Sequence, residues 1–99
     1  MIIRGTTPTI KYTFSVITTA DLTDAYLTIK KGGAVVVTKD LTAATVEQKA
    51  LSWTLTQEET LSVSGSTEIM LNWKAQDGTR GASMPTGVKF IPNHIEEAI

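Results

Sequence analysis

Histidine, cysteine and paired acids are the side chains that most often carry catalysis or bind metals, and this chain has few of them. Its one histidine is His94, and it contains no cysteine. A Ser-His-Asp triad would have to use His94 from a C-terminal tail with no rigid element behind it, whereas a triad needs members that are held in place. A tetrahedral zinc site would need carboxylates for all its other ligands. We therefore expect neither a catalytic triad nor a zinc site.

Two pairs of acidic residues are the next candidates for chemistry. Asp21 and Asp24 flank Leu22-Thr23, but a calcium loop needs several more oxygen ligands at fixed offsets. Aspartate is also common in turns without any metal, because its side chain hydrogen-bonds to the nearby backbone. Glu58 and Glu59 are neighbours in a predicted helix, so their side chains point about 100° apart and cannot flank one bond. Acidic residues in a first helical turn are expected from the helix dipole alone. No catalytic, metal or cofactor-binding residue is predicted.

The two tryptophans could form a stacking platform for sugars or bases. Trp53, however, lies between Leu51 and Leu55 at alternate positions, and Trp73 follows Leu71 in the same way. Because alternate residues of a strand share one face, this spacing favours core packing for both rings. No glycine-rich loop lies between a strand and a long helix, so a phosphate-binding loop is not expected either.

Length and composition define the molecule that holds these residues. The 99 residues suit a single domain, 1–99, and the absence of cysteine excludes disulfides. The net charge is −1, and the nine basic residues are scattered rather than clustered on one segment, so we expect no nucleic-acid partner. The N-terminus lacks the features of a signal peptide and no apolar run approaches about 20 residues, so we expect no membrane partner.

The chain is rich in residues that favour strands, with seventeen threonines and many valines and isoleucines. Apolar and polar residues alternate in the segments that we predict as strands: residues 9–16, 25–30, 35–37, 51–55 and 67–76, with a return after residue 78. Leu22-Thr23-Asp24 is predicted as a turn, and residues 41–47 as a loop or a short edge strand. Gly32-Gly33 and Asp77-Gly78 predict hairpins.

One short helix is predicted between the strands. Thr56 and Glu59 have the spacing of a capping box. Serines and a glycine at residues 62–66 end the helix within about two turns, as for a crossover between two sheets. The last return segment contains Gly81, Pro85 and Gly87, which predict a bulge.

These elements predict the fold class. Six to seven strands with antiparallel hairpins and one short crossover helix indicate an all-β protein, specifically an immunoglobulin-like antiparallel β-sandwich. A small barrel is the competing architecture.

Three stretches together resemble a known group of proteins: residues 4–9 (Arg-Gly-Thr-Thr-Pro-Thr), residues 55–61 (Leu-Thr-Gln-Glu-Glu-Thr-Leu), and residues 71–83, which include Leu-Asn-Trp and Asp-Gly-Thr-Arg. In order and spacing they are similar to small proteins of prophages and tailed phages of Gram-positive bacteria, related in pattern to the N-terminal β-sandwich domain of phage baseplate upper proteins. The resemblance implies a non-enzymatic virion or tail-associated structural protein, assembled in the bacterial cytoplasm. Its implied partners are other phage structural proteins or further copies of itself.

The alternative function is an immunoglobulin-like module that binds carbohydrate or another surface ligand. The two candidate functions predict different exposed groups. A lectin-like module should present an aromatic ring to solvent, whereas an assembly protein should offer strand edges and apolar termini to other chains. Four large apolar residues lie in terminal segments where a monomer has little reason to keep them. These candidate interaction residues are Ile2, Ile3, Ile95 and Ile99.

Overall fold

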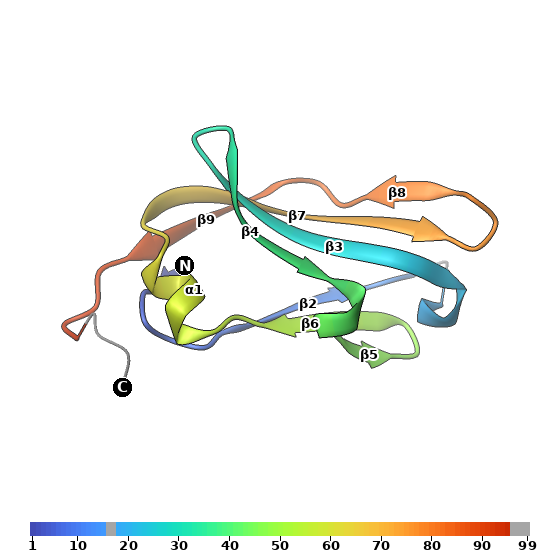
Figure 1. Cartoon of the computed structure of the whole chain (residues 1–99), viewed down its shortest axis with the longest axis horizontal. Coiled ribbons are helices and arrows are strands. Elements are labelled where there is room, and N and C mark those ends of the chain that lie inside the picture. Colours follow the sequence, from blue (N-terminus) through green and yellow to red (C-terminus); the bar gives the residue numbers. More distant parts are fainter. Residues whose placement is uncertain (16–17, 96–99) are drawn as a thin grey trace.

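The computed structural model describes residues 1–15 and 18–95, which form two β-sheets packed face to face (Figure 1). The larger sheet has the order β1 (Ile2–Ile3), β9 (Thr86–Ile91), β7 (Gly65–Ala75), β3 (Leu22–Lys31) and β4 (Ala34–Asp40), and β8 (Arg80–Ala82) also pairs with β7. The smaller sheet has the order β2 (Thr9–Thr13), β6 (Ala50–Thr54) and β5 (Thr45–Glu47). The helical elements are α1 (Gln57–Leu61) and two 3₁₀ turns, Thr19–Asp21 and Leu41–Ala43. In the described part of the chain, no helix is both long and apolar enough to span a membrane.

The strand order is that of the predicted immunoglobulin-like sandwich. Strands β2, β6 and β5 form one layer, as strands B, E and D do in that fold, and β3, β4, β7 and β9 take the places of C, C′, F and G. Helix α1 makes the crossover between β6 and β7. The separation into two sheets decides against the small barrel. Among the described residues there are nine strands rather than six or seven, because β1 is a two-residue strand and the return after β7 is divided into β8 and β9.

The core lies between the two sheets and is mostly aliphatic. From β3 it takes Ala25, Leu27 and Ile29, which are fully buried, as the alternating pattern predicts. The largest fully buried side chain is Trp53 on β6, whose indole Nε1 donates a hydrogen bond of 2.8 Å to the carbonyl of Asp40. This bond ties the smaller sheet to the end of β4 and satisfies the one polar group of the buried ring.

The turn predicted at Leu22-Thr23-Asp24 is wrong. Strand β3 already begins at Leu22, and its pairing with β7 shifts register between Leu22 and Asp24. Leu22 faces Ala75 and Asp24 faces Lys74, so Thr23 is an extra residue in the strand, as in a β-bulge. The bulge interrupts the two-residue alternation, which is why the sequence pattern at this point resembled a turn.

The other predicted turns and the helix cap are confirmed. Gly32, Gly33 and Gly78 all have positive φ angles in their hairpins, where a side chain would be strained. The return strand contains the predicted bulge, because between the pairs Asn72↔Ala82 and Ile69↔Thr86 two residues of β7 face three residues of the return.

Three further predictions lie near the ends of elements. The capping box of Thr56 and Glu59 is present in both directions. Residues 41–47 form a 3₁₀ turn followed by the short edge strand β5. Of the two predicted alternatives, a loop or a short edge strand, the edge strand is therefore confirmed. The first predicted strand continues less far than expected, since β2 ends at Thr13, and Val16 lies outside the described residues.

Candidate functional site

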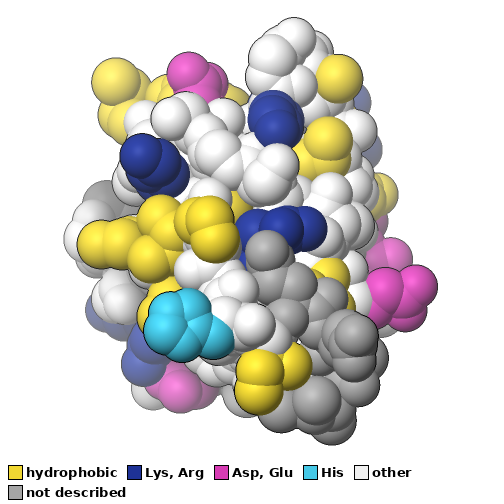
Figure 2. Space-filling model, turned by 90° about the vertical axis from the view of Figure 1, so that its left-hand side faces the viewer, with side chains coloured by type: hydrophobic (Ala, Val, Ile, Leu, Met, Phe, Trp, Pro, Cys, Tyr) yellow, Lys and Arg dark blue, Asp and Glu magenta, His cyan; other side chains and the backbone are white. Residues whose placement is uncertain are grey.

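The structure disperses the titratable residues that were considered for chemistry. Figure 2 shows His94 exposed at the end of the molecule that carries α1, beside a group of hydrophobic side chains. Asp21 accepts a hydrogen bond of 3.0 Å from the Thr18 hydroxyl, and Asp24 lies opposite Lys74 on the next strand. Within residues 1–15 and 18–95 there is no group of three or more His, Cys, Asp or Glu that could hold a metal ion.

Glu58 and Glu59 have different environments, as expected for neighbours in a helix. Glu58 is exposed. The Glu59 carboxylate accepts from the backbone N–H of Thr56 at 2.8 Å and forms an ion pair of 2.8 Å with Lys39. Burial raises the pKa of Glu59, but the Lys39 and Thr56 hydrogen bonds outweigh it and hold the pKa below its ordinary value of 4.5. Glu59 therefore fixes the start of α1 and ties it to β4.

The two tryptophans are not equally buried. The prediction of a core position is confirmed for Trp53, whereas Trp73 is half-buried and packs against the edge of the core. The Trp73 ring meets Phe14 edge-on, with ring centroids 5.4 Å apart and an interplanar angle of 77°. On the other strand it lies against Gly81, its direct partner in the β7–β8 pair. Both rings are thus explained by packing within the sandwich.

The aromatic ring that faces solvent is Tyr26, which the sequence analysis did not single out. It is 43% exposed on the outer face of the larger sheet, opposite Asn72 on β7. Together with Asp24, Lys74 and Arg80, these residues line an open depression of about 410 Å³. A flat ring beside carboxylate, amide and cationic groups can stack on a sugar and bond its hydroxyls. The aromatic composition gave no signal for this site, because one exposed ring in a strand is unremarkable in sequence.

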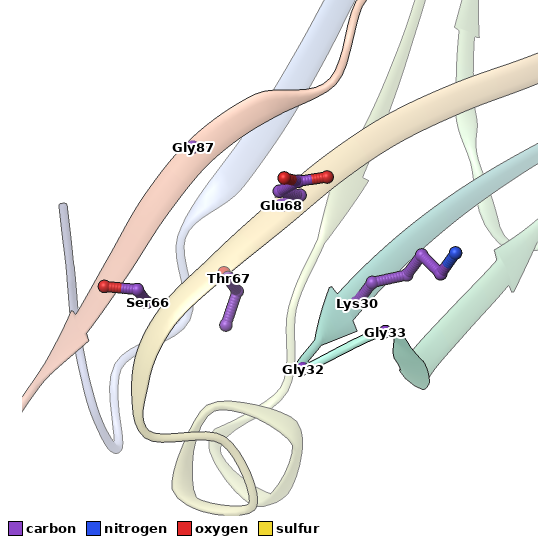
Figure 3. Close-up of a pocket in the computed structure, with 7 residues that line it drawn as sticks. All are labelled: Lys30, Gly32, Gly33, Ser66, Thr67, Glu68 and Gly87. Atoms are coloured by element: carbon purple, nitrogen blue, oxygen red, sulfur yellow. The ribbon is translucent and has the colours of Figure 1, made fainter.

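A second depression, of about 510 Å³, lies on the same sheet beside the β3–β4 hairpin (Figure 3). Lys30 and Glu68 face each other across β3 and β7, and Gly32, Gly33 and Gly87 leave open space around them. Figure 3 shows the polar side chains spread along the strands without converging on one point. All the charged groups here are exposed, so the depression lacks the buried, convergent donors of a small-molecule site.

The four terminal isoleucines do not form one surface. Ile2 is buried, only 8% exposed, and pairs with Phe90 in the parallel β1–β9 ladder, so the monomer itself explains this residue. Ile3 and Ile95 are exposed, as the interaction hypothesis requires. Ile99 lies outside the described residues.

Two neighbouring apolar side chains are exposed on β4, where the sequence alone does not decide which residues face the core. Its three consecutive valines fit either register, and the structure buries only Val37. The pairing of β3 with β4 shifts register between Ile29 and Lys30, so that Val36 is an extra residue. Both Val35 and Val36 are consequently exposed. No pattern in the sequence predicts this bulge.

Two of the three stretches that carried the family resemblance meet in space. The Arg4 guanidinium donates to the carbonyls of Leu61 (2.5 Å) and Val63 (3.0 Å). The Thr60 hydroxyl accepts from the N–H of Gly5 at 3.0 Å and donates to the carbonyl of Thr6 at 2.8 Å. The N-terminal segment is thereby fastened to α1.

The third stretch, residues 71–83, makes contacts that hold the segment after β7 against that strand. The Ser83 hydroxyl accepts a hydrogen bond of 2.9 Å from the N–H of Leu71, within the bulged part of the β7 pairing. Trp73 covers Gly81 in the same region. The residues of all three stretches thus have roles inside the fold.

The fold defines the class of the protein as an all-β sandwich of two sheets with one short helix at the crossover. Comparisons with protein-family models, with curated proteins and with solved structures find no match for the chain. Two surface features stand out from the rest: the Tyr26 depression and the edge of β4.

Proposed function

We propose that the protein is a non-enzymatic structural and interaction component of a phage or prophage particle, associated with the tail or baseplate. The observation that carries the interaction role is the edge strand β4, which presents Val35 and Val36 to solvent. Strand edges with exposed apolar residues recruit other chains by backbone pairing, and soluble monomers usually avoid them. Other phage structural proteins or further copies of the chain are the proposed partners.

The particle assignment is supported by the resemblance of residues 4–9, 55–61 and 71–83 to small phage and prophage proteins. These stretches are spaced along most of the chain and contact one another or their own strands through specific hydrogen bonds. A chain that shares them would share the same sandwich. On this proposal the protein is made in the bacterial cytoplasm and incorporated there into particles.

The test is whether the chain is part of a particle. Phage particles induced from the host and purified by density gradient are analysed by mass spectrometry, and the chain is expected in the particle band in fixed proportion to known tail proteins. Its presence only in the soluble lysate would contradict the proposal. Genes for tail, portal or head-completion proteins beside its own gene would support the proposal, and a metabolic operon would count against it.

The second candidate is a carbohydrate- or surface-ligand-binding module, and the exposed Tyr26 favours it. The ring lies in a depression with Asp24, Asn72 and Arg80, which supply acceptors and donors for hydroxyl groups. A glycan array probed with the wild type and with Tyr26→Ala decides this point. Binding that Tyr26→Ala abolishes would favour the module, and no binding by the wild type would remove it.

A further inference from the structure

We propose that the protein forms a two-fold symmetric dimer in which β4 of one copy pairs antiparallel with β4 of a second copy, joining the two larger sheets into one. This inference rests on the proposed assembly role and names the surface and the partner. In the described part of the chain, β4 pairs with β3 alone, so its other edge offers unpaired backbone groups. Pairing a strand edge with its own copy is self-complementary and closes without forming a fibre.

Of the strands at the sheet edges, β4 is the longest. It has seven residues, against two in β1, five in β2 and three in β5. The edge strand β2 carries an exposed lysine at its centre, Lys11, which bridges to Glu47 at 3.2 Å. Such a charge opposes strand addition. The one lysine of β4, Lys39, lies at the far end of the strand and is paired with Glu59 inside the molecule.

The side chains of β4 suit a second copy of the same strand. Val35 is 52% and Val36 is 44% exposed, and both would be covered by the partner strand. In an antiparallel pair centred near Val37, the beginning of each strand meets the end of the other.

Opposite charges lie beside the two ends of β4: Lys30 of the neighbouring strand β3 near its beginning, and Asp40 of β4 itself at its end. Asp40 lies at the end of the strand and shares the outer face of the sheet with Tyr26, its partner on β3, and with Lys30, four residues further along β3. A two-fold axis perpendicular to the sheet keeps outer faces together. It therefore places Asp40 of each copy near Lys30 of the other, within reach of a lysine side chain given strand spacings of about 4.8 Å. By the two-fold symmetry, the dimer contains two such contacts between opposite charges.

The test compares two matched valine substitutions in the full-length chain. Val36→Lys puts a charge on the proposed interface, and Val46→Lys puts the same charge on β5, where the valine is 54% exposed in another edge strand. Multi-angle light scattering over a concentration series should give about twice the 10.7 kDa monomer mass for the wild type and for Val46→Lys. Val36→Lys should remain at the monomer mass. Circular dichroism confirms that each variant is folded.

A charge reversal tests the predicted register. Lys30→Glu would bring like charges together at both ends of the dimer, so its dissociation constant should rise by about tenfold at low salt and less at high salt. Lys89→Glu is the control, because Lys89 is also exposed but lies on β9 at the other side of the sheet. Amide hydrogen exchange should show protection of residues 34–40 that rises with protein concentration.

Three results would overturn the dimer: a wild type that is monomeric at every concentration, a Val36→Lys variant that still dimerises, or equal losses in the two valine variants. These outcomes are separate from the particle test. A chain found in purified particles but monomeric alone would refute this dimer and leave the proposed function standing. A chain that dimerises through β4 but is absent from particles would refute the proposed function and leave the dimer standing.

Discussion

At the scale of single residues, Gly81 matters because of the side chain it lacks. A Cβ built there would lie 3.0 Å from Cη2 of Trp73 and closer still to two other atoms of the ring. Gly81→Ala should therefore push the indole out of its place between β8 and Phe14, at a cost of about 1–3 kcal/mol in the free energy of unfolding. Urea denaturation measures the cost, and a change in acrylamide quenching of tryptophan fluorescence reports the displaced ring.

The matched control for this substitution is Gly87→Ala. Gly87 also lies in a strand of the larger sheet, but a Cβ there would meet nothing within 4 Å. Its substitution should leave both stability and quenching close to those of the wild type. Equal effects of the two alanines would show that the loss comes from the strand backbone and not from the Trp73 ring.

Trp53 supplies the second prediction at this scale. Its ring is almost fully buried and its indole N–H is bonded to Asp40, so Trp53→Ala leaves a cavity and an unpaired carbonyl. The expected cost is about 3–5 kcal/mol, enough to unfold a domain of ordinary stability. Trp53→Phe keeps most of the volume and should be less damaging. A loss below about 1 kcal/mol for the alanine variant would mean that the ring faces solvent.

The sequence predicts the burial of residues better than it predicts their exposure. Trp53 could be placed in the core because it alternates with leucines on both sides, and alternate residues of a strand share one face. Trp73 has the same spacing but packs against the edge of the core, and it is only half-buried. Tyr26 and Val36 could not be singled out, because their exposure depends on the neighbouring strands and on a bulge rather than on local pattern.

At the scale of elements, a buried hydroxyl helps to hold α1 to the N-terminal segment, beside the bonds that Arg4 donates. Thr60 is fully buried, and its side chain bonds to both Gly5 and Thr6. Thr60→Val keeps the shape of the side chain but leaves the Gly5 N–H and the Thr6 carbonyl without this partner. We expect a loss of about 1–3 kcal/mol in the free energy of unfolding, measured by urea denaturation.

Thr60→Ser is the control for that substitution, since it retains the hydroxyl and removes only a methyl group. It should lose less stability than Thr60→Val. Amide exchange at Gly5 should accelerate in the valine variant alone. A serine variant that lost more stability than the valine variant would show that packing of the methyl group, and not hydrogen bonding, is what holds the segment.

The Glu59–Lys39 pair links α1 to β4 and predicts a pH dependence. The pKa of Glu59 is held below 4.5 in the folded chain. Its contribution to stability is therefore complete above pH 4.5 and lost as the pH falls below that value through the folded pKa. Glu59→Gln should be less stable than the wild type at pH 7, and the difference should shrink in acid. Denaturation curves between pH 3 and pH 7 provide the measurement.

Glu58→Gln serves as the control for this effect, because it removes the same charge from the same helix at an exposed position. It leaves the ion pair of Glu59 with Lys39 in place and should therefore lower the stability at pH 7 less than Glu59→Gln does. Some acid sensitivity should persist in Glu59→Gln, since hydrogen bonds from Thr42 to Asp40 and from Thr79 to Asp77 also hold the pKa of those carboxyls low. A Glu59→Gln curve parallel to the wild type throughout would contradict the proposed role of the pair.

Element boundaries were predictable where turn chemistry is local and were missed where strands are irregular. Glycines with positive φ and the capping box are set by neighbouring residues, so the hairpins and α1 follow from sequence. The bulges at Thr23 and Val36 are set by the register with adjacent strands. They disturb the two-residue alternation in a way that a single segment cannot explain.

At the scale of the whole molecule, the sandwich architecture follows from strand number and spacing, while the surfaces available for assembly depend on which strands end up at the edges. The sequence named the terminal isoleucines as interaction candidates. The structure moves Ile2 into the core and adds β4, whose edge position depends on the order of all the strands in the sheet. Self-association through the tail and self-association through β4 are therefore separable.

The last prediction separates them by removing the tail. The truncation should end at Asn93, because the Asn93 side chain donates a hydrogen bond of 2.9 Å to the carbonyl of Arg4 and helps to fasten the N-terminal segment. A chain of residues 1–93 lacks Ile95 and Ile99 but keeps β4 intact. If β4 is the contact, this chain should dimerise with the same dissociation constant as the full chain, and Val36→Lys should abolish dimers of both. Light scattering measures both effects. A truncated chain that is monomeric while the full chain dimerises would show that the interface lies in the C-terminal tail and not on β4. The exposed Ile95 would then be the residue to test.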